Sequence, residues 1–187
     1  TFTASNYSIT YTTGTLTVNQ KSLTVSATGV DKVYDGLTTA TVSLSDNRVS
    51  GDVFTASYTS ASFADANVGT NKPVSVSGIS ISGTDAANYS LSSTTASTTA
   101  NITPRALTID ADDKTVTYGT VPSFSFTPTG LQNGETVGSV SFATDATVST
   151  SGNYNAGSWT ITPSNATGGT FTASNYSITY TTGTLTV

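Results

Sequence analysis

Few side chains in this sequence of 187 residues could carry chemistry, and the first group is Tyr34-Asp35-Gly36. It could form a ligand or Ca²⁺ loop. The same residues also suit a plain turn, in which Asp bonds its own backbone, Gly takes a positive φ and Tyr packs beneath. We favour the turn, because Tyr118-Gly119 keeps the Tyr-Gly pair and loses the Asp.

Asp110, Asp112 and Asp113 form the second group, and they are weak candidates for a calcium site. Calcium needs six to eight oxygen ligands, several of them carboxylates. Asp110 and Asp112 alternate onto one face of a strand, but no DxDxDG loop supports them. A solvated acidic strand edge, which blunts strand pairing, is the interpretation that we favour. We therefore expect no resident cofactor.

The third group consists of Trp159 and a pair of carboxylates. Trp159 is the only tryptophan and could stack on a sugar. It alternates with Ile161, however, which favours a place in the core or in a contact between modules. Glu135 and Asp145 could in principle act as a glycosidase pair, since such enzymes need only two carboxylates. Nothing in the sequence marks them as a pair, so we expect no catalytic residue.

The composition lacks several of the side chains that most often carry catalysis. The chain has no His, Cys or Met, which removes the commonest general base, thiolate chemistry, zinc fingers and disulfides. Six basic and 11 acidic residues give a net charge of -5, which argues against nucleic acid and anionic membranes as partners. No apolar run approaches the roughly 18 residues of a membrane helix. We expect a non-enzymatic protein and, without Met, an internal fragment or a processed product.

One exact repeat organises the chain. Residues 1–18, TFTASNYSITYTTGTLTV, recur letter for letter as residues 170–187, an offset of 169 residues. Chance does not produce 18 identities in a row. The sequence therefore predicts a tandem array, of which this chain holds one full period and the end of a preceding copy.

A weaker half-period divides the chain into 1–18, 19–103 and 104–187. Segments echo each other in the same order at similar spacing: 21–27 with 105–111, 31–36 with 113–119, 67–69 with 155–157, and 88–91 with 175–178. Each half has about 85 residues, which is large enough to fold alone but only marginally. Pro104 lies at the short connection between them and favours a stiff joint.

The local pattern has a period of two throughout, which predicts strands. Apolar residues alternate with Ser and Thr at 23–27, 74–76, 79–81, 107–111, 124–126, 140–142 and 159–161. Residues 7–18 and their copy 176–187 are expected to form hairpins that turn at Thr13-Gly14 and Thr182-Gly183. At most a short helix is expected, with 131–140 as its best candidate, and an irregular segment is expected at 65–71. The fold class is all-β, with two small end-to-end modules that are sandwich-like or β-grasp-like.

These landmarks resemble two families of repeat domains from large bacterial surface proteins. The run Val33-Tyr34-Asp35-Gly36-Leu37-Thr38-Thr39-Ala40, with Asn67-Val68-Gly69 and Asn88-Tyr89-Ser90-Leu91, resembles a YDG domain. Val116-Thr117-Tyr118-Gly119, with 130–135, 154–157 and the closing 175–187, resembles an MBG domain of the YGX type. Residues 1–18 then resemble the end of an upstream MBG copy. The resemblance implies haemagglutinin-like and adhesin-like exported proteins, and it attaches no catalytic residue to this chain.

We expect a structural stalk repeat of an extracellular adhesin at the bacterial cell surface, with neighbouring repeats as its partners and roles in adhesion and biofilms. The alternative is a weak, multivalent module that binds a glycan or a matrix polysaccharide. A lone hairpin is barely stable in water. Residues 1–18 are therefore expected to pack against module 19–103 as a native junction would, with strand swapping between chains as the other possibility.

Overall fold

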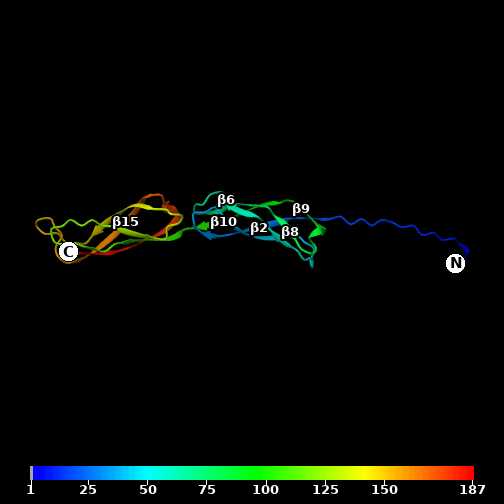
Figure 1. The fold of residues 1–187 in the computed structure, drawn as a ribbon, viewed down its shortest axis with the longest axis horizontal. Coiled ribbons are helices and arrows are strands. Elements are labelled where there is room, and N and C mark those ends of the chain that lie inside the picture. The colour runs from blue at the N-terminus through cyan, green and yellow to red at the C-terminus, as the bar shows by residue number, and fades with distance from the viewer. Residues whose placement is uncertain (1) are drawn as a thin grey trace.

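The computed structural model describes residues 2–187 and shows an elongated all-β molecule (Figure 1). Two modules lie end to end, and residues 2–17 extend away from the first module at the end opposite the second (Figure 1). Within 2–187, the helical pieces are three 3-10 turns of three residues each: η1 (Ala4–Asn6), η2 (Ala86–Asn88) and η3 (Ala173–Asn175). The predicted fold class, all-β in two end-to-end modules, is confirmed.

The first module has two curled layers of strands. In one layer, β10 pairs in parallel with β3 and antiparallel with β7, which pairs with β6. In the other, β1 pairs in parallel with β9, β2 continues β1 and pairs with β4, and β5 pairs with β8. The strands are β1 (Lys21–Leu23), β2 (Val25–Val30), β3 (Lys32–Val33), β4 (Thr41–Asp46), β5 (Thr55–Ser57), β6 (Ser60–Phe63), β7 (Gly69–Ser77), β8 (Ser80–Ser82), β9 (Tyr89–Leu91) and β10 (Thr95–Thr103).

The second module repeats this topology. Here β11 pairs in parallel with β16 and antiparallel with β13, while β17 lies between β12 and β15, and β15 pairs with β14. The registers correspond as well: Lys21 is paired with Tyr89, and Arg105 with Tyr176. The strands are β11 (Arg105–Ala111), β12 (Lys114–Thr115), β13 (Phe126–Thr129), β14 (Val137–Thr144), β15 (Ser158–Gly169), β16 (Tyr176–Thr181) and β17 (Gly183–Thr186).

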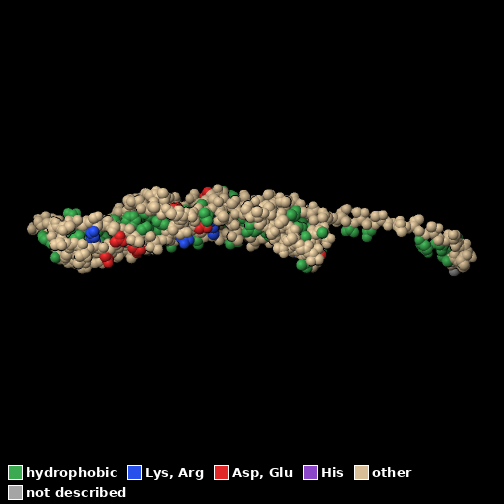
Figure 2. Space-filling model, viewed as in Figure 1, with side chains coloured by type: hydrophobic (Ala, Val, Ile, Leu, Met, Phe, Trp, Pro, Cys, Tyr) green, Lys and Arg blue, Asp and Glu red, His purple; other side chains and the backbone are tan. Residues whose placement is uncertain are grey.

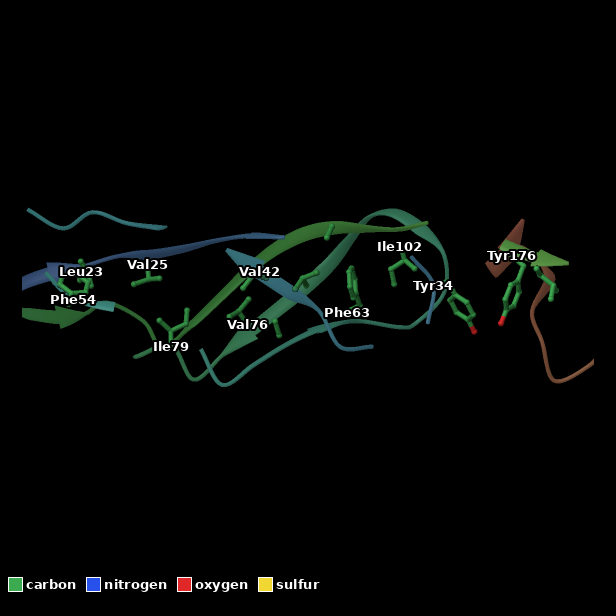
Figure 3. Close-up of a cluster of buried hydrophobic side chains, with 14 of the residues drawn as sticks. Leu23, Val25, Tyr34, Val42, Phe54, Phe63, Val76, Ile79, Ile102 and Tyr176 are labelled. Atoms are coloured by element: carbon green, nitrogen blue, oxygen red, sulfur yellow. The ribbon is translucent and has the colours of Figure 1, made fainter. Parts of the chain in front are cut away.

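The core follows the predicted alternation. Leu23 and Val25 are buried in the first module, and Leu107, Ile109 and Ala111 are buried at the matching positions of β11, with Ser and Thr on the opposite faces. A continuous cluster of buried side chains runs along the first module and crosses into the second (Figure 3). The burial of apolar surface, which contributes about 25 cal/mol per Å², is the main stabilising term in this Ser- and Thr-rich chain.

The predicted hairpin over 176–187 is wrong. β16 pairs with β11 in one sheet, whereas β17 pairs with β12 and β15 in another, so the chain crosses between layers at Gly183. A Cβ added to Gly183 would lie 2.4 Å from the Ala111 carbonyl oxygen, so only glycine fits this crossing. Sequence alternation shows that a segment is a strand, but it does not show which strand it pairs with.

The predicted packing of residues 1–18 on the first module is also wrong. Thr1 lies outside the described residues; residues 2–18 form no strand, and their backbone bonds close only the local turn η1. Figure 2 shows hydrophobic side chains standing out along this segment. The partners of the identical residues 171–187 are β11, β12 and β15, all of which belong to the second module, so the first module offers this segment no equivalent sites.

The predicted helix over 131–140 is absent from the structure. Asn133 and Gly134 have φ values of 48° and 70°, which turn the chain through the left-handed region, and β14 begins at Val137. An Asn-Gly-Glu sequence suits a tight turn as well as a helix start, and here the strand pairing with β15 decides. Residues 64–67 are bends, and β7 begins at Gly69, so the irregular segment ends earlier than predicted.

Substitution of Gly183 tests the crossing, and Gly14 is its identical-sequence control. We expect Gly183→Ala to lower the free energy of unfolding by about 1–3 kcal/mol, because the new methyl group meets backbone atoms. Gly14→Ala, with nothing within 4 Å, should change it by less than about 0.5 kcal/mol. Urea unfolding of both variants in dilute solution measures this. Equal effects would contradict the crossing.

Candidate functional site: the module junction

The chemically most organised part of the molecule is the junction at which the two modules meet. Tyr34, at the end of the first module, points at Tyr176 of the second (Figure 3). Their ring centroids are 5.3 Å apart at an interplanar angle of 76°, an edge-to-face contact. Tyr34 is 4% exposed and Tyr176 6% exposed. The first residue of the Tyr34-Asp35-Gly36 motif is therefore a contact between modules.

The carboxylate of Glu135 joins the two tyrosines. The Tyr34 hydroxyl donates to Glu135 Oε1 at 2.7 Å, and the Tyr176 hydroxyl donates to Oε2. The Tyr176 oxygen in turn accepts a hydrogen bond from the backbone N–H of Gln132 at 3.1 Å. Hydrogen bonds to an ionised acceptor are stronger than neutral ones, and here one carboxylate receives a donor from each module.

Asn175 forms a second polar link. It is 1% exposed, and its Oδ1 accepts from the backbone N–H of Val68 at 2.9 Å. Its Nδ2 donates to Oδ1 of Asn67 at 3.1 Å. A buried amide is tolerated only when its polar atoms are paired. The motif Asn67-Val68-Gly69 of the first module and the motif Asn175-Tyr176 of the second therefore recognise each other directly.

A turn at Tyr34-Asp35-Gly36 forms part of the first module's side of the junction. Asp35 Oδ1 accepts from the Leu37 N–H at 2.9 Å and from Lys32 Nζ at 2.7 Å, and Gly36 has a φ of 73°. A Cβ on Gly36 would come within 2.3 Å of the Asn133 side-chain nitrogen, so the glycine also allows the second module to approach closely. Lys32 donates further to the carbonyl oxygens of Leu37 and Thr39.

The connection between the modules is short. β10 ends at Thr103 and β11 begins at Arg105, which leaves Pro104 as the single residue between the two strands. The Tyr34 N–H donates to the Thr103 carbonyl at 2.9 Å, which ties the turn to this connection. Because proline fixes its own φ and restricts the preceding residue, the covalent link and the non-covalent contacts constrain the same orientation.

Burial sets the electrostatics of the junction. It raises the pKa of Tyr34 and of Tyr176, and hydrogen bonding to the Glu135 carboxylate raises both further. For Asp35, burial favours the neutral form, but the hydrogen bonds from Lys32 and the Leu37 amide outweigh it and hold its pKa below the usual range. Both tyrosines are therefore neutral donors at physiological pH.

The remaining aromatic candidates lie away from this junction, at the far end of the second module. Tyr118 is 51% exposed, and its hydroxyl bonds the side chains of Ser149 and Ser151. Gly119 beside it has a φ of 89°. Trp159 packs on the small core around Ile161 and Leu185, and its Nε1 donates to the Asn155 carbonyl at 3.0 Å. Trp159 is therefore partly buried against the core of its own module and does not lie between the modules.

The candidate carboxylates lie at separate positions in the module. Asp112 accepts from Thr127 Oγ1, Asp113 accepts from the Thr184 N–H, and Asp110 lies on β11. Among residues 2–187, no three His, Cys, Asp or Glu side chains converge as a metal site. Asp145 accepts from the Thr160 N–H at one end of β14, and Glu135 lies just before the other end. That strand of eight residues spans roughly 26 Å, far beyond the separation of glycosidase carboxylates.

One shallow depression of about 260 Å³ lies beside the turn and includes Lys32 and Asp35 in its lining. Both charged groups already bond each other, and Lys32 Nζ also lies 5.6 Å from the ring centre of Phe63. Asp31, which also lines the depression, accepts hydrogen bonds from the backbone N–H and the side-chain Nδ2 of Asn101.

The fold and the junction define a repeat protein made of two related β modules that recognise each other end to end. The chain contains two domains in tandem: a YDG domain over residues 19–98, followed by an MBG domain of the YGX type over residues 107–186. Both occur in surface proteins. No curated protein and no solved structure matches the chain.

The sequence alone does not place Glu135 and Asn175 at a junction between modules. Glu135 was considered only as half of a catalytic pair, and Asn175 only as part of a repeated motif. A usable signal was present, since each module has an Asn-Tyr pair, Asn88-Tyr89 or Asn175-Tyr176, preceded by a carboxylate in a loop. Asp52 accepts from Tyr89 as Glu135 does from Tyr176.

Removal of the buried amide tests the polar link, and the exact repeat supplies a matched control. We expect Asn175→Ala to destabilise the chain by about 1–3 kcal/mol, because the Val68 N–H loses its acceptor. Asn6→Ala changes the same sequence position where it is exposed, and should have an effect below about 0.5 kcal/mol. Urea unfolding compares the two variants. An equally mild effect at Asn175 would show that the link is not structural.

The Glu135 carboxylate should contribute, after burial, to the raised pKa values of both tyrosines. We expect Glu135→Gln to lower the pKa of Tyr34 and of Tyr176 toward the usual value of about 10, because the charge that opposes phenolate formation is removed. NMR titration of ¹³Cζ-labelled tyrosine measures this, and Tyr118 should not respond. In the wild type, these raised values mean that the stability contribution is complete below about pH 10 and is lost as the pH rises further. Unchanged pKa values in the variant would contradict the arrangement.

Proposed function

We propose that this chain is a structural extender repeat of a bacterial cell-surface adhesin, which holds a distal binding region away from the cell. The observation that carries the proposal is the junction, where a hydrophobic cluster runs unbroken from one module into the next. A single linking residue and several interlocking hydrogen bonds accompany it. Such a joint transmits orientation from module to module, which a spacer requires and a flexible linker does not provide.

The starting end of the first module has the same parts as the starting end of the second. Tyr89 donates to Asp52 Oδ2 at 2.5 Å and accepts from the Val49 N–H at 2.8 Å, as Tyr176 does with Glu135 and Gln132. Asn88, the counterpart of Asn175, is exposed. This end is equipped to receive a preceding module in the same way.

The closing ends match too. Gly69 pairs with Ile102 at the end of the first module, and Gly157 exchanges two backbone hydrogen bonds with Val187 at the end of the second. β11 begins three residues after Ile102, and β1 begins three residues after Val18, the copy of Val187. Because the two spacings are equal, we expect the junction between one period and the next to resemble the junction within a period. This supports a continuous rod.

Weak multivalent binding of a glycan or matrix polysaccharide is the second proposal. Trp159, the side chain first considered for it, packs partly buried against the small core of the module, but Tyr118 is half exposed beside the hydroxyls of Ser149 and Ser151. An aromatic ring among hydroxyls suits a sugar. A glycan-array signal that disappears in Tyr118→Ala would favour binding over a purely structural role.

An extracellular location at the bacterial cell surface forms part of the proposal, and the occurrence of both domain families in surface proteins supports it. Within residues 2–187, no helix has the length and hydrophobicity to cross a membrane. The low charge, with 6 basic side chains among 187 residues, supports neighbouring repeats rather than nucleic acid as partners.

Small-angle X-ray scattering on chains of one, two and three periods tests the extender role. We expect the maximum dimension to rise linearly with the number of periods, because each junction fixes the direction of the next module. As a control, replacing Pro104 by a flexible Gly-Ser linker of ten residues should make the growth sub-linear. Sub-linear growth of the unaltered chains would contradict the rod.

A further inference from the structure

We propose that Asn88 docks onto the loop Asn155-Ala156-Gly157 of the preceding period in the tandem array. This docking rests on the proposed extender role, because it requires a preceding period, and it names the atoms that meet there. Its template is the buried link within a period, in which Asn175 accepts from the Val68 N–H at 2.9 Å and donates to Asn67 Oδ1 at 3.1 Å.

Asn88 stands in the same local structure as Asn175. Each asparagine ends a 3-10 turn, η2 or η3, and its backbone N–H donates to the carbonyl oxygen three residues earlier, at 3.0 Å for Asn88 and 2.9 Å for Asn175. Each is followed by a tyrosine that pairs with the first residue of the opening strand of its module. The Asn175 side chain is buried, whereas the Asn88 side chain is exposed and makes no hydrogen bond within residues 2–187.

The loop Asn155-Ala156-Gly157 matches the loop Asn67-Val68-Gly69 in position. Gly157 exchanges two backbone hydrogen bonds with Val187, and Gly69 pairs with Ile102. Each glycine therefore lies at the closing end of its module, with an asparagine two residues before it.

The hydrogen-bonding groups of the two loops match as well. Asn175 uses the Oδ1 of Asn67 as an acceptor and the N–H of Val68 as a donor. Asn155 donates its Nδ2 to a threonine hydroxyl of its own module, and its Oδ1 remains available to accept. Ala156 is exposed, and its N–H has no acceptor among residues 2–187. The second loop thus presents the same acceptor and the same donor in the same order.

The exact repeat places this loop beside Asn88. Val18 is the copy of Val187, which pairs with Gly157, so the Gly157 of a preceding period lies opposite Val18. Val18 and Asn88 line one depression of about 220 Å³ at the start of the first module. Ala156, directly before Gly157, therefore arrives at the depression that Asn88 lines.

Two contacts hold the incoming chain at this place. Gln20 Nε2 donates to the carbonyl oxygen of Ala87, the residue before Asn88, at 2.9 Å. Lys21 then begins β1 and pairs with Tyr89, the residue after Asn88. The chain that carries the preceding module is thereby anchored on both sides of Asn88, which reduces the ordering that docking must supply.

Docking pairs the available groups together. Asn88 Oδ1 accepts from the Ala156 N–H, and Asn88 Nδ2 donates to Asn155 Oδ1, as Asn175 does within a period. No existing hydrogen bond has to break, because these groups are not engaged within residues 2–187. A buried amide is tolerated only when its polar atoms are paired, so the contact favours this loop over a surface that lacks the matching donor and acceptor.

Hydrogen exchange tests the link in a chain of two periods, in which protein ligation confines ¹⁵N to the first period. We expect the Ala156 N–H of the first period to exchange at least about tenfold more slowly than in the single-period chain, because it gains a buried acceptor. Asn88→Ala in the second period should remove this protection. The same substitution in the first period, which has no module before it, is the matched control and should leave the protection unchanged.

Exchange of the Ala156 N–H at equal rates in the two chains would overturn the proposal, as would protection that survives Asn88→Ala in the second period. Scattering from the same two-period chain separates this link from the extender role. Linear growth with an unprotected Ala156 would overturn the link and leave the extender role standing. Sub-linear growth with a protected Ala156 would support the link and contradict the extender role.

Discussion

The carboxylate of Glu135 receives a tyrosine hydroxyl from each module, and the rest of the junction is arranged around this interaction. A carboxylate in a low-dielectric setting must be well paired to be tolerated. Two phenol donors supply that pairing only when Tyr34 and Tyr176 are both in place. The position of each module is thereby tied to the other through one acidic group, in a chain that has a single Glu.

The apolar and backbone parts of the junction follow from the same requirement. The rings of Tyr34 and Tyr176 meet edge to face, Gly36 lets Asn133 approach, and the amide of Asn175 pairs the backbone of Val68. Part of the motifs by which the two families are recognised, Tyr34-Asp35-Gly36, Asn67-Val68-Gly69 and Asn175-Tyr176, thus meets at the junction. A motif that looks like a loop signature in one module becomes meaningful when the next module is beside it.

The two copies of one sequence separate local from non-local determinants of structure. The 3-10 turn forms at Ala4–Asn6 and again at Ala173–Asn175, so the local sequence is sufficient for it. The strands form only in the second copy, where β11, β12 and β15 supply hydrogen bonds and a hydrophobic surface. Alternation of apolar and polar residues makes a segment able to form a strand, and the strand forms where neighbouring strands pair with that segment.

This distinction explains what could be predicted from the sequence. The alternation of Leu107, Ile109 and Ala111 predicted a buried face because period two depends on the strand alone. The crossing at Gly183 was mistaken for a hairpin turn because the pairing partners lie in distant segments. Glu135 was considered as a catalytic group because sequence gives its chemistry but not its neighbours. The fold class and the modules were accessible, whereas the junction required the spatial meeting of residues about a hundred positions apart.

The central claim is that the two modules form one rigid unit held by this junction. Residual dipolar couplings, measured for backbone amides of the full chain in a weakly aligning medium, test it most directly. A rigid junction predicts that couplings from 21–103 and from 105–187 fit a single alignment tensor with the orientation of the structure. Two tensors of different magnitude would show that the modules move independently, and would contradict the account.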